Sequence, residues 1–177
     1  MTAQGEAPAH PSDAQPAATT PTTVSLRIAG SALKPRESNV EWTGAGGGGG
    51  CIYASSGTTN AVFNTPLILP QGSTVEYVRM YYNDSNATVD SRAWFTVYNL
   101  YGDLVNEWLV TSSGSSGYGY STTDEINHTV DYDSYSYVLN WRPNSLGSDN
   151  QLCGFRIYYT PPAGSSGTVL FPIVVPR

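Results

Sequence analysis

Residues 92–111 read RAWFTVYNLYGDLVNEWLVT and contain the clearest strand signal in the chain. Two runs rich in aromatic and β-branched residues, 92–100 and 105–111, flank a turn that contains Tyr-Gly-Asp. Glycine and aspartate are common in turns because they tolerate the backbone conformations that tight turns need. Two such runs joined by a short turn predict an antiparallel β-hairpin.

Similar runs continue on both sides of this hairpin. In 23–28, apolar and polar residues alternate, which is typical of a strand with one buried face. None of the runs has the three- and four-residue apolar spacing of a helix. Segments rich in Gly, Asn, Asp, Ser and Pro separate them, and 112–119 is one of these expected turns; the runs lie at 23–28, 51–54, 61–69, 74–82, 126–130, 135–141 and 152–160. About ten strands at this spacing predict an all-β domain over 23–160, an antiparallel, jelly-roll-like β-sandwich.

The two ends of the chain differ from this central domain. Residues 1–22 are rich in Pro, Ala and Thr, which predicts an extended tail without a core of its own. Residues 161–177 begin with a Pro, Gly and Ser linker and end in a further strand signal. That strand is apolar on both faces and is expected to need burial on both sides; its apolar residues are Val169, Leu170, Phe171, Ile173, Val174 and Val175.

Charge is scarce and negative. Only 12% of the residues are charged, against about 25% in average soluble domains, and the formal net charge is −6. Nucleic-acid binding depends on Lys and Arg that neutralise phosphates, so this balance argues against a nucleic-acid partner. Residues 43–75 are uncharged but too polar to span a membrane, and no membrane insertion is expected. The first residues show no signal-peptide pattern, although the composition favours an extracellular location.

Cys51 and Cys153 are the only cysteines. A structural zinc site needs about four ligands, and the chain has no closely spaced set of Cys and His. The two cysteines therefore either form one disulfide or remain buried thiols, and we expect the disulfide. Such a bond forms in oxidising compartments, which agrees with an extracellular protein.

Residue types that carry catalysis in other proteins form no recognisable pattern here. His128 lies in an expected strand, and a nucleophile would need a histidine base with an acid to orient it. The glycine run 44–50 has no following helix, which a dinucleotide site requires. Asp131 and Asp133 offer the oxygen ligands that calcium prefers, but their spacing matches no EF-hand loop. We expect no enzyme and no cofactor, and Asp131 with Asp133 is the one metal candidate.

Tyrosine is the most unusual component, with 13 tyrosines beside 4 tryptophans. Aromatic rings with polar tips serve at sugar-binding surfaces and at protein interfaces. Rings that pair across strands inside a sandwich are structural, and more than half of these rings are expected to be of that kind. The candidates for an aromatic surface are Tyr101, Tyr118, Tyr120, Tyr132 and Tyr135.

Three Asn-x-Ser/Thr sequons are candidate glycosylation sites, at Asn83, Asn86 and Asn127. They matter only in a cell that exports the protein and attaches glycans. Because chance sequons are common in a chain rich in Asn, Ser and Thr, glycosylation stays an open alternative.

Four stretches resemble a family of secreted bacterial proteins of uncharacterised function: GCIYA at 50–54, AWFTVY at 93–98, YVLNWR at 137–142 and QLCGFRIYY at 151–159. The resemblance covers about residues 26–159. It implies an extracellular β-domain and carries no activity or catalytic residue. The arrangement is also similar to protomers of bacterial extracellular fibrils, in which terminal strands link β-sandwiches.

Three functions fit these features. Our first hypothesis is a structural subunit of an extracellular filament or surface assembly, in which a sandwich accepts the terminal strand of another copy. The alternative is a carbohydrate-binding or adhesive module that stacks aromatic rings on polysaccharide. The third is a viral or phage coat or fibre protein, although residues 1–22 contain no Lys or Arg with which to bind a genome.

Overall fold

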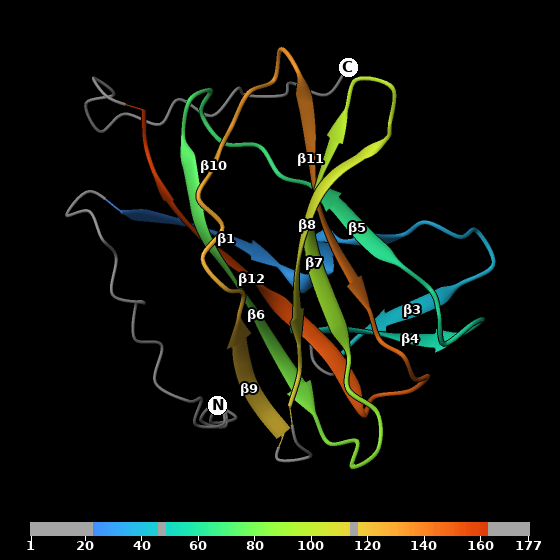
Figure 1. The fold of residues 1–177 in the computed structure, drawn as a ribbon. Coiled ribbons are helices and arrows are strands. Elements are labelled where there is room, and N and C mark those ends of the chain that lie inside the picture. Colours follow the sequence, from blue (N-terminus) through green and yellow to red (C-terminus); the bar gives the residue numbers. More distant parts are fainter. Residues whose placement is uncertain (1–22, 46–48, 114–116, 163–177) are drawn as a thin grey trace, which may run out of the picture.

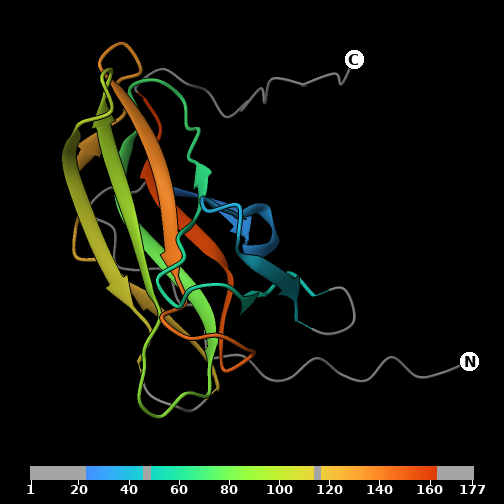
Figure 2. The same cartoon turned by 90° about the vertical axis from the view of Figure 1, so that its right-hand side faces the viewer.

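The computed structural model describes residues 23–45, 49–113 and 117–162. In these residues twelve strands form two antiparallel sheets that pack face to face (Figure 1, Figure 2). The prediction of an all-β antiparallel sandwich is confirmed. Within the same ranges, no helix has the length and apolar character needed to cross a membrane. The tail 1–22 and the expected strand at 169–175 lie outside the described residues.

The larger sheet is built around its two longest strands, β6 and β12, which pair antiparallel along their whole length. Strands β9 and β10 pair with the two halves of β6, and β1 and β4 pair with the other side of β12. Figure 1 shows β9, β6, β12 and β1 side by side. The seven strands are β1 (Val24–Ala29), β3 (Glu41–Gly44), β4 (Ile52–Ser56), β6 (Thr74–Asp84), β9 (Gly117–Thr122), β10 (His128–Thr129) and β12 (Asn150–Thr160).

The smaller sheet has the order β2-β5-β11-β7-β8. Its strands β7 and β8 are the hairpin expected from residues 92–111, paired from Arg92 and Thr111 down to the turn. Within the described residues β8 pairs only with β7, so it is an edge strand. The five strands are β2 (Lys34–Pro35), β5 (Phe63–Pro66), β7 (Arg92–Asn99), β8 (Leu104–Thr111) and β11 (Tyr135–Arg142).

Alternate residues of both sheets fill the space between them. On β7, for example, Ala93, Phe95 and Val97 are completely buried. The ring of Phe95 stacks on the rings of Trp108 and Tyr137, with centroid distances of 5.5 and 6.1 Å. Burying a large apolar side chain stabilises a fold by about 1.5–3 kcal/mol, so these rings of the smaller sheet are a stabilising part of the core.

The strand predictions differ from the structure in several places. The expected turn at 112–119 contains the start of β9, because a strand rich in Gly, Ser and Tyr has the composition of a loop. The expected strands at 126–130 and 61–69 shorten to β10 and β5, although Leu67 and Leu69 beyond β5 are buried as loop residues. The two-residue strand β2 carries no sequence signal of its own.

Candidate functional site

A groove on the outer face of the larger sheet combines aromatic, cationic and glycine residues. Its volume is about 410 Å³, and its walls come from β1, β12, β6 and β9. The strand register places Ala29, Gly154, Tyr81 and Tyr120 in one row across these four strands. We call this feature the tyrosine groove.

Two of the residues that line the groove are glycines, Gly154 of β12 and Gly119 of β9. A Cβ atom on Gly154 would lie 2.5 Å from the carbonyl oxygen of Ile28, and one on Gly119 would lie 2.7 Å from Cε2 of Tyr82. Real Cβ atoms essentially never approach another atom so closely, so neither position accepts a side chain without movement of its neighbours. The groove is therefore lined by backbone at these positions.

Three tyrosines form the wall on the side of β6 and β9. The rings of Tyr81 and Tyr120 have centroids 6.1 Å apart and are tilted by 52°. That spacing lies within the favourable range for aromatic pairs. Tyr118 lies two residues before Tyr120 on the same face of β9 and also lines the groove. Two of the five expected surface tyrosines thus meet here, together with Tyr81, which the sequence analysis did not select.

Arginines lie among the tyrosines of this face. The guanidinium carbon of Arg79 is 4.4 Å from the ring centroid of Tyr120 and 5.3 Å from that of Tyr158. Arg79 Nε also donates a hydrogen bond of 3.0 Å to Thr122 Oγ1. These contacts fit favourable cation–π geometry and fix the position of the charge. Arg27 of β1 is exposed and lines the groove directly.

No local sequence pattern pointed to these arginines as part of a site. One signal was available: the chain has only 8 Lys and Arg, and these arginines lie inside apolar strand runs, where a charge is unusual. Their common face depends on strand register, which no local pattern reveals.

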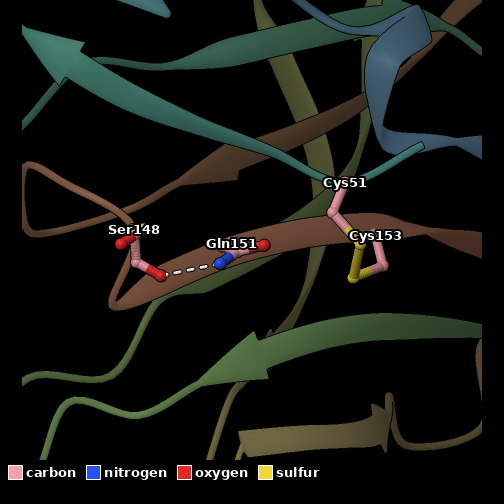
Figure 3. Close-up of a disulfide and its surroundings, with 4 residues drawn as sticks. All are labelled: Cys51, Ser148, Gln151 and Cys153. Atoms are coloured by element: carbon pink, nitrogen blue, oxygen red, sulfur yellow. Dashed lines mark hydrogen bonds between the residues drawn. A yellow bond between two sulfur atoms is a disulfide. The ribbon is translucent and has the colours of Figure 1, made fainter. Parts of the chain in front are cut away.

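The predicted disulfide between Cys51 and Cys153 is present (Figure 3). It lies at the edge of the groove, which Cys153 lines. Cys153 lies in β12, and Cys51 immediately precedes β4. Beside them, Gln151 Nε2 donates a hydrogen bond of 2.8 Å to the Ser148 carbonyl oxygen. The bond joins positions 102 residues apart and ties β4 to β12. Bonds of this kind are typical of oxidising compartments.

The five expected surface tyrosines do not form one surface, which corrects that expectation. Tyr101 is 93% exposed in the turn between β7 and β8. Tyr132 anchors a loop, because its hydroxyl accepts a hydrogen bond of 2.9 Å from the Leu69 backbone N–H. Tyr135 packs against His128, with ring centroids 6.0 Å apart. Cross-strand and loop packing accounts for these last two rings.

His128 lies in a cluster of aromatic side chains at the end of the sandwich. The ring centroids of Trp108 and Tyr137 are 5.8 and 5.5 Å from that of His128. Its Nε2 is 3.4 Å from the Tyr137 hydroxyl. Burial lowers the pKa of His128, so the imidazole is neutral at pH 7. These contacts give His128 a packing role.

The calcium candidate finds no support in the structure. Asp131 Oδ1 accepts hydrogen bonds of 3.1 Å from Gln71 Nε2 and from the Asp133 backbone N–H. A hydrogen bond from the Ser134 side chain, followed by those from Gln71 and Asp133, lowers the pKa of Asp131. Throughout 23–45, 49–113 and 117–162, no three His, Cys, Asp or Glu side chains gather as metal ligands would.

The three sequons occupy different environments. Asn83 lies within β6 between β9 and β12, whereas Asn127 is exposed. Asn86 Oδ1 accepts hydrogen bonds from the backbone N–H and the hydroxyl of Thr88, each 3.0 Å long. Glycosylation stays a prediction at all three positions.

A second hollow, of about 460 Å³, involves the end of the smaller sheet. Its lining includes Arg92 and Arg142, which pair across β7 and β11, but also the acidic Asp90. The Trp94 ring lies 5.5 Å from the guanidinium carbon of Arg142, but Trp94 does not line the hollow. The tyrosine groove is therefore the better candidate for a ligand with both apolar faces and polar edges.

No family model and no curated protein sequence matches the chain. Among solved structures, the carbohydrate-binding module CBM29-2 aligns with 13% identity and a TM-score of 0.48, covering 85% of this chain and 99% of that one. The CBM36-1 domain of a multidomain xylanase from the hindgut metagenome of Trinervitermes trinervoides aligns with 12% identity and a TM-score of 0.46, covering 82% and 100%. The Tobacco streak virus coat protein aligns with 10% identity and a TM-score of 0.41, covering 91% and 100%. At these identities and TM-scores, the likenesses carry no conclusion about what this chain binds.

Proposed function

We propose that this protein is a non-catalytic extracellular module that binds polysaccharide in the tyrosine groove. The observation that carries the proposal is the wall of Tyr81, Tyr118 and Tyr120 in an open groove of about 410 Å³. A sugar ring has an apolar face of C–H groups and an edge of hydroxyls. Tyrosine offers an apolar ring and a hydroxyl tip, and the arginines add fixed hydrogen-bond donors. A largely apolar groove with a few convergent polar groups is the usual form of a ligand site.

The groove also suits a chain-like ligand better than a small ligand that is enclosed on all sides. It is open to solvent and lies on a sheet face, with contributions from four neighbouring strands. The Cys51–Cys153 bond holds the sheet together beside it. A rigid site of this kind loses little conformational entropy when a ligand binds.

Affinity electrophoresis of the full chain through gels that contain soluble polysaccharides tests this function. We expect at least one polymer to retard the protein. Tyr118→Ala and Tyr120→Ala should each weaken that retardation by about tenfold, since truncating a central aromatic contact commonly costs more than 1 kcal/mol. Tyr101→Ala is the matched control, because this exposed tyrosine lies in the hairpin turn and outside the groove.

Two results would overturn the proposal. One is migration that no polysaccharide changes. The other is retardation that the Tyr118→Ala and Tyr120→Ala variants retain in full, while thermal unfolding shows that both variants are folded.

Assembly through terminal strands is the second candidate, and the edge strand β8 is the observation that favours it. Its side chains Leu104, Val105 and Leu109 are 59%, 47% and 51% exposed. An unpaired edge with exposed apolar residues can accept a further strand. Residues 169–175 of another copy, apolar on both faces, have the composition of such a strand. Sedimentation of the full chain and of a chain ending at residue 162 tests this: only the full chain should form polymers.

A further inference from the structure

The hollow at the end of the smaller sheet contains a row of polar residues from three strands. Thr111 of β8 pairs in register with Arg92 of β7, and Arg92 pairs with Arg142 of β11. Residues directly opposite each other on antiparallel strands share a face, with Cα atoms about 4.5–5.5 Å apart. All three residues line the hollow of about 460 Å³. We call this feature the arginine hollow.

The two arginines bring positive charge to the hollow without a protein anion bound to it. Throughout 23–45, 49–113 and 117–162, neither guanidinium group takes part in an ion pair or a hydrogen bond. The guanidinium carbon of Arg142 is 5.5 Å from the ring centroid of Trp94, and Arg142 Nε is buried without a hydrogen-bond partner. Arg92 is exposed. An anion beside these groups would reduce the cost of burying an unpaired charge.

Two loop segments that border the hollow are tied together by hydrogen bonds. Asn144, which follows β11 and has a φ of 58°, donates a hydrogen bond of 2.8 Å from Nδ2 to the Asp90 carbonyl oxygen. Asn150 Nδ2 donates hydrogen bonds of 2.8 Å to the Val89 carbonyl oxygen and 3.2 Å to the Pro143 carbonyl oxygen. The shape of the hollow is therefore present before a ligand binds, and a preformed site loses little entropy on binding.

The lining points to a ligand that has an oxyanion beside hydroxyl groups. Asn60 and the Asp90 carboxylate also line the hollow, and both accept hydrogen bonds from hydroxyls. A carboxylate ligand has two oxygens, which match the planar fork of one arginine. A sulfate or phosphate monoester has three free oxygens, so it can accept hydrogen bonds from Arg92 and Arg142 together.

We propose that the arginine hollow binds the sulfate or phosphate ester group of a sugar. Arg92 and Arg142 donate hydrogen bonds to the ester oxygens, and Asp90 and Asn60 accept hydrogen bonds from neighbouring hydroxyls. This site lies on a different sheet from the tyrosine groove, and the two sets of lining residues do not overlap. The inference therefore goes beyond the proposed function and does not depend on it.

NMR titration of the full chain with four small probes tests the ligand class. The probes are glucose 6-sulfate, glucose 6-phosphate, glucuronate and glucose, and the Nε–Hε signals of the arginine side chains report where they bind. We expect at least one ester to shift the Arg92 and Arg142 signals and to bind at least about tenfold more tightly than glucuronate or glucose, in line with the strength of hydrogen bonds to charged groups. The ester that binds more tightly identifies the group as sulfate or phosphate.

Variants locate the binding in the arginine hollow. Arg92→Gln should weaken binding of the tighter ester by about tenfold, and Arg92→Lys, which keeps the charge without the fork, should restore only part of it. Arg36→Gln is the matched control, because it removes an exposed cation that follows β2 and does not line the hollow. Tyr118→Ala should leave ester binding unchanged, because Tyr118 lines the tyrosine groove.

Three results would overturn this inference. The first is an unchanged affinity for the tighter ester in Arg92→Gln, while thermal unfolding shows that the variant is folded. The second is glucuronate binding as tight as that of both esters, which would reject the tetrahedral group. The third is the absence of any shift of the Arg92 and Arg142 signals with either ester. Ester binding that persists in Tyr118→Ala, while polysaccharide binding is lost, would show that the two sites act separately.

Discussion

Gly154 of β12 lies so close to Ile28 of β1 that a Cβ atom at position 154 would be 2.5 Å from the Ile28 carbonyl oxygen. Gly154 pairs with Ala29 at the end of the β1–β12 ladder and also lines the tyrosine groove. One glycine therefore serves both the fold and the candidate site.

Gly154→Ala should destabilise the protein by about 1–3 kcal/mol, because the added methyl group must push β1 away from β12. Gly50→Ala is the control, since a Cβ atom there would meet only the Ala29 side chain at an ordinary 3.8 Å. Urea unfolding of both variants measures the difference. Equal urea midpoints for the two variants would show that β1 can move away from β12 without loss of stability.

Removal of the disulfide in Cys51→Ser/Cys153→Ser should lower the free energy of unfolding by up to about 4–5 kcal/mol, since the bond closes a long loop. Thermal unfolding with and without a reducing agent checks this. The reducing agent should lower the midpoint of the natural chain and leave that of the double variant unchanged. An equal response of both proteins would contradict the expected role of the bond.

His128 should make stability depend on pH. Burial lowers its pKa below the ordinary value of 6.5, so the unfolded chain binds a proton more readily than the folded one. The neutral imidazole therefore contributes stability above about pH 6.5, and this contribution is lost as the pH falls through the lower pKa of the folded state. His128→Phe should flatten this part of the profile, measured as urea midpoints between about pH 5 and pH 8.

Asp131 provides an internal check on this experiment. Its pKa is lowered from 3.8, so its contribution is lost only in more acidic solution, below the window in which His128 titrates. A slope between pH 5 and pH 8 that persists undiminished in His128→Phe would assign the effect to another group.

Leu109→Lys should impair assembly if β8 accepts a strand from another copy. A charged side chain on an edge strand opposes the approach of another strand. Leu109 is half exposed, so the variant should keep the stability of the natural chain to within about 0.5 kcal/mol. Leu100→Lys is the matched control, because Leu100 is exposed in the adjacent turn outside β8. Sedimentation and electron microscopy compare the variants, and polymers formed equally by both would exclude β8 as the acceptor.

The candidate site could be predicted only in fragments. Tyr118 and Tyr120 stood out because tyrosine is so frequent in this chain, but the same criterion also selected Tyr132 and Tyr135, which pack against other elements. Arg27 and Arg79 lie far apart in the sequence and share no local motif. Only the pairing of β1 with β12 and of β12 with β6 brings them into one sheet.

The sequence by itself determined the all-β class, the hairpin of β7 and β8 and the one pairing open to the two cysteines, because alternation, turn residues and a single pair of thiols are local or countable properties. The tertiary structure alone decided which residues share the groove. A shift of one residue in the register of β12 would move every one of its side chains to the opposite face of the sheet. That register depends on long-range packing, including the contact of Gly154 with Ile28, and no stretch of sequence contains it.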